Sequence, residues 1–151
     1  MSERAISLER IVDASVERVY RAWSDPETLT TWFAPRVEGS LAVGARSLLI
    51  WPDRRFWLEM LEAEPERRIR FRWAVLLDGS LVSAKDARAT DVTVNISPHG
   101  YGTRLTLHDG PFEMDGPEGP DDWAAAMESW VQALANLRAQ LDFSVDLRRR
   151  P

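Results

Sequence analysis

The fold is decided near the C-terminus, where residues 123–141 read WAAAMESWVQALANLRAQL. Large apolar residues recur there at intervals of 4, 3, 4, 3 and 4, which is the spacing of one face of an α-helix. They are Trp123, Met127, Trp130, Leu134, Leu137 and Leu141. About twenty residues at 1.5 Å each make a rod of roughly 30 Å, long enough to cross a small sheet. We expect Asp121 or Asp122 to cap the start of this helix, where a carboxylate is favourable.

Strand patterns fill the middle of the chain. The clearest covers residues 68–73, where three arginines alternate with Ile69, Phe71 and Trp73, as in an antiparallel strand with one buried face and one wet face. Further strands are predicted over residues 6–12, 37–41, 46–51, 56–64, 88–97 and 103–108, and the last two form a hairpin. Two short helices, over residues 16–23 and 26–32, are each ended by a proline dipeptide. Residues 78–86 and 109–120 are predicted to be loops.

One strand, two short helices, six strands and a long helix predict an α+β fold, with a curved antiparallel sheet around the C-terminal helix. The length of 151 residues indicates a single domain. Its core is predicted over residues 5–142, followed by a C-terminal tail over residues 143–151. The basic residues Arg148 to Arg150 in that tail are expected to be solvated.

Composition excludes several classes of protein. A net charge of −5 argues against general affinity for nucleic acid. The absence of cysteine excludes disulfides and thiolate metal sites. No stretch approaches the ~18–20 apolar residues that span a membrane, and the N-terminus does not resemble a signal peptide. We therefore expect a cytoplasmic protein that does not bind membranes.

Several motifs resemble those of a known superfamily. They are VDA at residues 12–14, VYRAW at 19–23, SDPE at 24–27, WFAP at 32–35, EAEP at 62–65 and GTRLTLH at 102–108. With Trp130 on the final helix, they resemble the SRPBCC (START-like) superfamily, in the branch of homologues of the activator of the heat-shock protein 90 ATPase. The resemblance implies the helix-grip fold, with a cavity between sheet and helix. Ser129 and Ser15 depart from the family pattern, which often has glycine and proline there.

The apolar interior is the main candidate site. Nine residues are expected to line it: Phe71, Trp73, Val92, Val94, Leu105, Trp123, Met127, Trp130 and Leu134. A helical stripe of this kind is more often plain core, and the resemblance is what favours a cavity. Indole rings make large rigid walls, and methionine adapts to irregular shapes.

Polar candidates are few. Glu59 and Glu62 lie on a mostly apolar strand, so one of them could face the interior, where burial would raise its pKa. The alternative is that both face water or pair with arginines. His108 is a possible polar contact at a cavity mouth, or else a surface residue. No catalytic constellation, cofactor motif or metal-ligand spacing is visible, so no catalytic residue, cofactor or metal ion is expected.

Three functions stay open at this stage. The first is binding of a hydrophobic or aromatic small molecule. The second is an enzyme of the cyclase or dehydratase type, which the resemblance implies for related domains. The third is a co-chaperone-like interaction module, implied only by the name of the branch. A homodimer is also expected if Trp51 or Trp57 is exposed on an outer strand.

Overall fold

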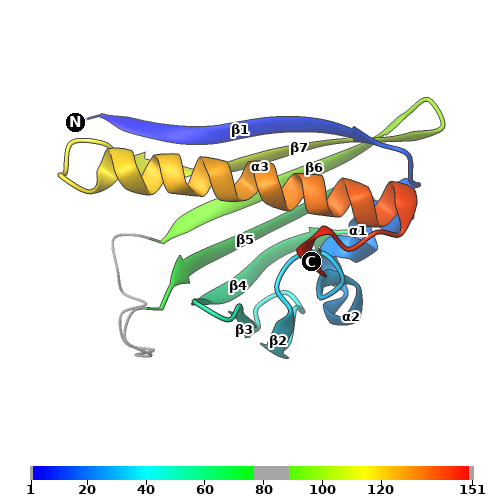
Figure 1. The fold of residues 1–151 in the computed structure, drawn as a ribbon, viewed down its shortest axis with the longest axis horizontal. Helices are drawn as coiled ribbons and strands as arrows, with labels where there is room; N and C mark the ends of the chain where they lie inside the picture. Colours follow the sequence, from blue (N-terminus) through cyan, green and yellow to red (C-terminus); the bar gives the residue numbers. More distant parts are fainter. Residues whose placement is uncertain (1, 77–88, 150–151) are drawn as a thin grey trace.

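Seven strands form one antiparallel sheet in the computed structural model, which describes residues 2–76 and 89–149 (Figure 1). The strand order is β1-β7-β6-β5-β4-β3-β2, so β1 and β2 are the edges. The strands are β1 Glu3–Val12, β2 Arg36–Gly39, β3 Arg46–Ile50, β4 Arg55–Glu64, β5 Arg68–Val75, β6 Thr90–His99 and β7 Gly102–Glu113. The predicted strands are all confirmed, with shifts at their ends.

Side-chain caps begin the two short helices. The Ser15 hydroxyl accepts the Arg18 N–H at 3.2 Å at the start of α1, Val16–Ser24. The Asp25 carboxylate accepts the Thr28 N–H at 3.1 Å at the start of α2, Pro26–Leu29. Both residues satisfy a helix N–H that would otherwise lack a partner. Ser15 is therefore a sound replacement for the proline of the family pattern.

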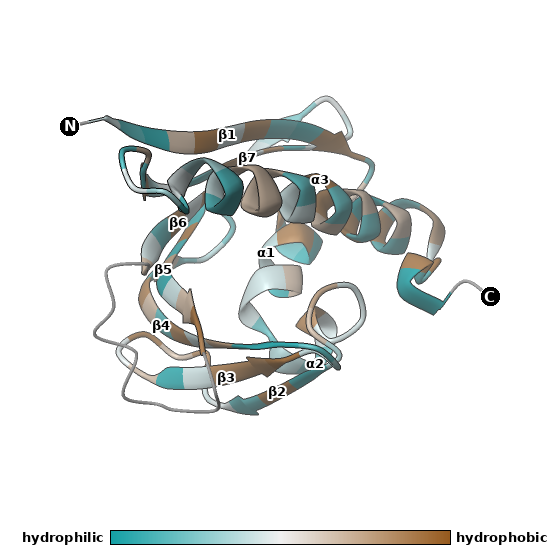
Figure 2. Cartoon of the chain, turned by 60° about the vertical axis from the view of Figure 1, so that its left-hand side comes forward, coloured by the Kyte–Doolittle hydropathy of each residue, from teal (hydrophilic) through white to brown (hydrophobic). Residues whose placement is uncertain are grey.

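The sheet curves around the long helix α3, Gly119–Phe143, which crosses its concave side (Figures 1 and 2). The helices α1 and α2 lie at the end of the sheet that faces the C-terminal half of α3 (Figure 1). The chain finishes in a short 3-10 helix, η2, Leu147–Arg149. This is the α+β helix-grip arrangement predicted from the sequence.

The alternation on β5 separates the two faces of the sheet as predicted. Ile69, Phe71 and Trp73 are at most 8% exposed and belong to the main core under α3. Arg70 and Arg72 face the other way and pair with Asp91 of β6 at 3.6 and 2.9 Å. Along β5 the concave side is thus apolar, whereas Arg70 and Arg72 lie on the convex side.

Two predictions at the start of α3 are wrong. Strand β7 runs on to Glu113, because its residues 104–113 pair with β1, so only residues 114–118 remain of the predicted 109–120 loop. The helix then begins at Gly119, two residues before Asp121, and its N-cap Glu118 makes no side-chain cap hydrogen bond. Asp121 and Asp122 lie in the first turn, where acid is still favourable. The other predicted loop, residues 78–86, lies outside the described residues.

The C-terminal tail and two tryptophans also differ from prediction. Arg148 is not a solvated charge: its guanidinium pairs with Asp146 at 2.8 Å and donates to the carbonyls of Thr30 and Phe33 at 2.7 and 2.9 Å. Trp57 lies on the convex face but is only 5% exposed, within a small cluster beneath the Arg46 guanidinium. Trp51 is half-buried against the main core. Neither indole offers the exposed surface on which the homodimer prediction depended.

Candidate functional site

The structure brings the nine predicted lining residues together. Seven of them are buried in the main core, at 0–8% exposure, and come from the three strands β5, β6 and β7 and from α3. Trp123 and Met127 are half-buried and pack against the same cluster. The residues do meet between the sheet and α3, whereas an enclosed cavity among them stays a prediction.

Aromatic rings fill the end of this interior next to α1 and α2. Trp130 is their centre, with ring centroids of Phe33, Trp73 and Trp23 at 5.5, 5.3 and 6.1 Å. Trp32 packs edge-on against Trp23 at 4.8 Å, and its indole N–H donates to the Ala22 carbonyl. Most of these contacts have the tilted, edge or offset geometry that aromatic rings prefer. This end of the interior is therefore rigid.

The other end, under the N-terminal half of α3, is less completely covered. The buried residues of α3 are Trp130, near its midpoint, and Ala133, Leu134, Leu137 and Leu141 in its C-terminal half. Trp123, Ala126 and Met127 precede them on the same helix and touch the core, but they remain partly exposed. Phe112 of β7 and Leu8 of β1 are half-buried against the core as well. An apolar surface in this part of the molecule is thus within reach of solvent.

Two indole N–H groups fix α3 to neighbouring strands. The Trp130 Nε1 donates to Asp109 Oδ2 of β7 at 2.8 Å. The Trp123 Nε1 donates to the Ala5 carbonyl of β1 at 3.3 Å. Ala5 sits where the β1–β7 register shifts between Arg4 and Ile6. Bulges of this kind redirect backbone and side-chain groups, often next to functional sites.

Asp109 is the most deeply buried acidic residue among the described residues, at 1% exposure. It follows the buried Leu105 and Leu107 at every second position of β7, so its side chain faces the concave side. Burial raises the pKa of the Asp109 carboxyl, opposed by hydrogen bonds from Thr90 and Trp130 and by the charge of His108. Its Oδ1 has no hydrogen-bond partner of good geometry among the described residues. A buried acid with a shifted pKa is a common mark of a functional site.

The three polar candidates from the sequence lie elsewhere. Glu59 and Glu62 both face the convex side, where they pair with Arg46 at 4.0 Å and Arg70 at 3.1 Å. The suggestion that one of them faces the interior is wrong, because a register shift between Met60 and Glu62 keeps both on the outer face. His108 is exposed between the inward-facing Leu107 and Asp109, so it too points away from the interior.

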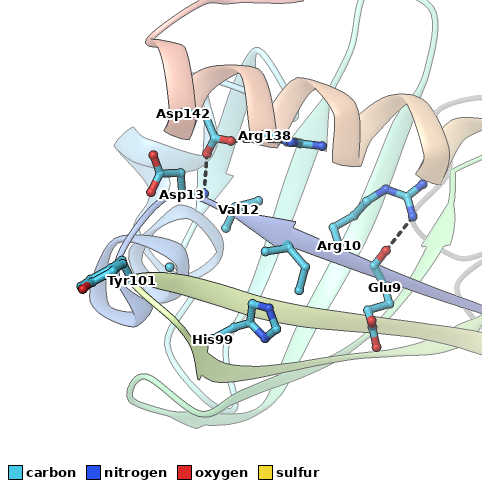
Figure 3. A pocket seen from close by; sticks show the side chains of 10 residues that line it. Glu9, Arg10, Val12, Asp13, His99, Tyr101, Arg138 and Asp142 are labelled. Carbon is cyan, nitrogen blue, oxygen red and sulfur yellow. Dashed lines mark hydrogen bonds and ion pairs between the residues drawn. The ribbon is translucent and has the colours of Figure 1, made fainter.

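Two of the open hollows on the surface of the described residues contain none of the nine lining residues. The first, of about 420 Å³, lies by the ends of β1 and α3 (Figure 3). There the Asp142 carboxylate accepts the Asp13 N–H at 2.8 Å and pairs with Arg138. The second, of about 580 Å³, lies between α1 and the β4–β5 turn. Within residues 2–76 and 89–149, no three His, Cys, Asp or Glu residues cluster as metal ligands would.

A curved antiparallel sheet that grips a long C-terminal helix defines the helix-grip class of proteins. Residues 13–142 match the model of the family described as Activator of Hsp90 ATPase homolog 1-like protein. Because this match covers most of the chain, the protein belongs to that family. A search of curated proteins gave no match.

Solved structures share the fold at low sequence identity. DynU16, a protein from the dynemicin biosynthetic locus, is 23% identical with a TM-score of 0.74 over 94% of this chain, which spans only 48% of DynU16. MLL2253 from Mesorhizobium loti is 24% identical, with a TM-score of 0.76, and 91% of this chain and 96% of that one are covered. The Aha1 dimer from Colwellia psychrerythraea is 15% identical, with a TM-score of 0.76, and the match covers 93% of this chain and 97% of the Aha1 chain. These identities establish the fold alone. The described helices are all too short or too polar to cross a lipid bilayer.

Proposed function

We propose that this protein binds a small apolar molecule with aromatic character between the concave face of the sheet and the N-terminal half of α3. One observation carries the proposal: the core-facing residues Trp123, Ala126 and Met127 stay partly exposed, while those further along α3 are buried. Covering apolar surface is favourable by roughly 25 cal/mol per Å². A ligand that covered these side chains would complete the core.

The chemistry of the lining supports this assignment. Ligand sites are mostly apolar and aromatic, with a few polar groups that set orientation. Trp130 and Trp73 provide rigid walls with fixed ring geometry, and Met127 is a side chain that can adapt to a ligand's shape. Asp109 is a polar group next to this lining, because its carboxylate accepts a hydrogen bond from the Trp130 indole.

An enzyme of the cyclase or dehydratase type on the same fold is the second candidate. Asp109 favours it, because burial raises the pKa of its carboxyl, as it does for many acids that donate or accept a proton in catalysis. Catalysis would require Asp109 for turnover and not for binding alone. Glu59, Glu62 and His108 are excluded from this role by their outward positions.

The remaining predictions about partners rest on the sequence and the family. A homodimer is consistent with the Aha1 dimer among the similar structures, although Trp51 and Trp57 would not form its interface. A chaperone partner follows only from the family description. A cytoplasmic location is likewise an expectation from the sequence.

Titration with the neutral fluorescent probe 1-aminoanthracene tests the proposed function. We expect saturable binding to the wild type, and at least tenfold weaker binding to Ala126→Phe, because the larger side chain fills the space next to Met127. Ala125→Phe is the matched control, because Ala125 precedes Ala126 in the chain but is exposed. The affinity of this control variant for the probe should stay within twofold of the wild-type value. Equal affinity of the two variants, or no saturable binding by the wild type, would contradict the proposal.

A further inference from the structure

Two buried polar atoms next to Trp130 have no hydrogen-bond partner among the described residues. They are Oδ1 of Asp109 and Nε1 of Trp23. Asp109 is 1% exposed and Trp23 is 2% exposed, so bulk water does not satisfy either group. Buried polar atoms are nearly always paired, and an unpaired one in a native structure calls for a physical reason.

Both atoms belong to residues that touch the same indole ring. The Trp130 N–H holds Asp109 Oδ2 at 2.8 Å, which orients the carboxyl between β7 and α3. The Trp23 ring lies with its centroid 6.1 Å from that of Trp130. The residues that carry the unpaired acceptor, Asp109 Oδ1, and the unpaired donor, Trp23 Nε1, thus both contact the Trp130 indole.

The position along α3 connects these atoms to the proposed ligand. Met127 and Trp123 precede Trp130 by three and seven residues, so the three side chains share one face of the helix. Trp130 is buried, whereas the other two are partly exposed. Asp109 therefore lies at the inner limit of the surface that the ligand would cover.

We propose that Asp109 is the polar anchor of this site, and that the ligand is an apolar ring compound with a hydroxyl group that hydrogen-bonds to Asp109 Oδ1. The assignment rests on the proposed function and adds the chemical class of the ligand. The Trp130 bond occupies Oδ2, and the nearby Thr90 hydroxyl also acts on this carboxyl, but Oδ1 has no hydrogen bond of good geometry from the described residues.

A hydroxyl group fits this oxygen in either protonation state. It donates to an ionised carboxylate, and it accepts from the O–H of a neutral carboxylic acid. A ligand without a polar group would leave Oδ1 without a hydrogen bond, so the desolvation cost of this buried atom would be the same as in the free protein.

Affinities for 2-naphthol and naphthalene test the anchor, because the two probes share a ring system and differ by one hydroxyl. We expect the wild type to prefer 2-naphthol by about tenfold, the effect of one good buried hydrogen bond. In Asp109→Leu this preference should fall to about one. Glu62→Gln, which removes a carboxylate from the convex face, should keep it.

The outcomes separate the two proposals. Equal affinities in the wild type, or an unchanged preference in Asp109→Leu, would overturn the anchor and leave the ligand site standing. Failure of both probes to bind would overturn the proposed function, and the anchor with it. Circular dichroism checks that each variant folds, and Asp109→Ala replaces Asp109→Leu if the latter does not fold. The ratio of the wild-type affinities for 2-naphthol and naphthalene can contradict the anchor without any variant.

Discussion

The Asp109 carboxyl lies in an apolar environment and accepts a hydrogen bond from the Trp130 indole. It is buried on the same face of β7 as Leu107, and Trp130 Nε1 donates to its Oδ2 at 2.8 Å. Desolvation is the largest influence on its pKa and outweighs the groups that favour the charged form. The charged carboxylate is therefore less stable in the folded protein than in the unfolded chain.

The raised pKa of Asp109 predicts that the effect of Asp109→Asn on the free energy of unfolding depends on pH. A raised folded pKa means that the native state holds its proton over a pH range in which the unfolded chain has lost it, so stability falls as pH rises through that range. The range starts near the ordinary value of 3.8 and ends at the raised pKa. Within it, the unfolding free energy of Asp109→Asn relative to wild type should increase by up to about 1.4 kcal/mol per pH unit.

Urea denaturation of both proteins from pH 4 to pH 8 measures this difference. His108 and Asp91, whose charges act on the pKa of Asp109, are present in both proteins, so the comparison isolates the carboxyl at position 109. A difference that is flat across this range, or that shrinks as pH rises, would show that Asp109 is not desolvated in the way described.

Asp109 also shows where sequence reasoning stopped short. The alternation of Leu105 and Leu107 continues to residue 109, but residues 109–120 are rich in glycine, proline and acid, so the predicted strand ends at His108. Pairing with β1 carries β7 past Gly110 and Pro111. Tertiary pairing overrode a local turn signal, and the acid at the third inward position was missed.

At the level of elements, periodicity predicted most of the fold. Alternation on β5 and the 4-3 spacing on α3 depend only on which side chains are apolar, and both are confirmed. The orientation of Glu59 and Glu62 depends on a register shift in β4 that no sequence pattern marks. The role of Arg148 likewise depends on carbonyl groups more than a hundred residues away.

The C-terminal end of α3 makes a second stability prediction. Ser144 caps the helix in the left-handed region, at φ 56°, where a Cβ is strained and glycine is preferred. We expect Ser144→Gly to stabilise the protein by about 0.5–1 kcal/mol, measured as a higher urea midpoint.

Ser129 provides the matched control for this variant. It is exposed within α3, so Ser129→Gly should destabilise by about 0.5 kcal/mol through lower helix propensity. Replacing serine by glycine is thus expected to raise stability at position 144 and to lower it at position 129. A loss of stability in Ser144→Gly would contradict the strain at the helix end.

At the level of the whole molecule, the two ends of the interior differ. Around Trp130, rings from α1, the α2 loop, β5 and α3 pack against one another. Under the N-terminal half of α3, the apolar face is only partly covered. The family fold predicted a space between sheet and helix, and this asymmetry assigns the proposed ligand to one end of it.

Intermolecular NOEs between isotope-labelled protein and bound 1-aminoanthracene test that location most directly. We predict cross-peaks from the probe to the Met127 methyl group and to the Trp123 and Trp130 indoles. Cross-peaks confined to the open hollow at Ile11, Tyr101 and Arg138, with none to α3 residues 123–130, would contradict a ligand site between the sheet and the helix.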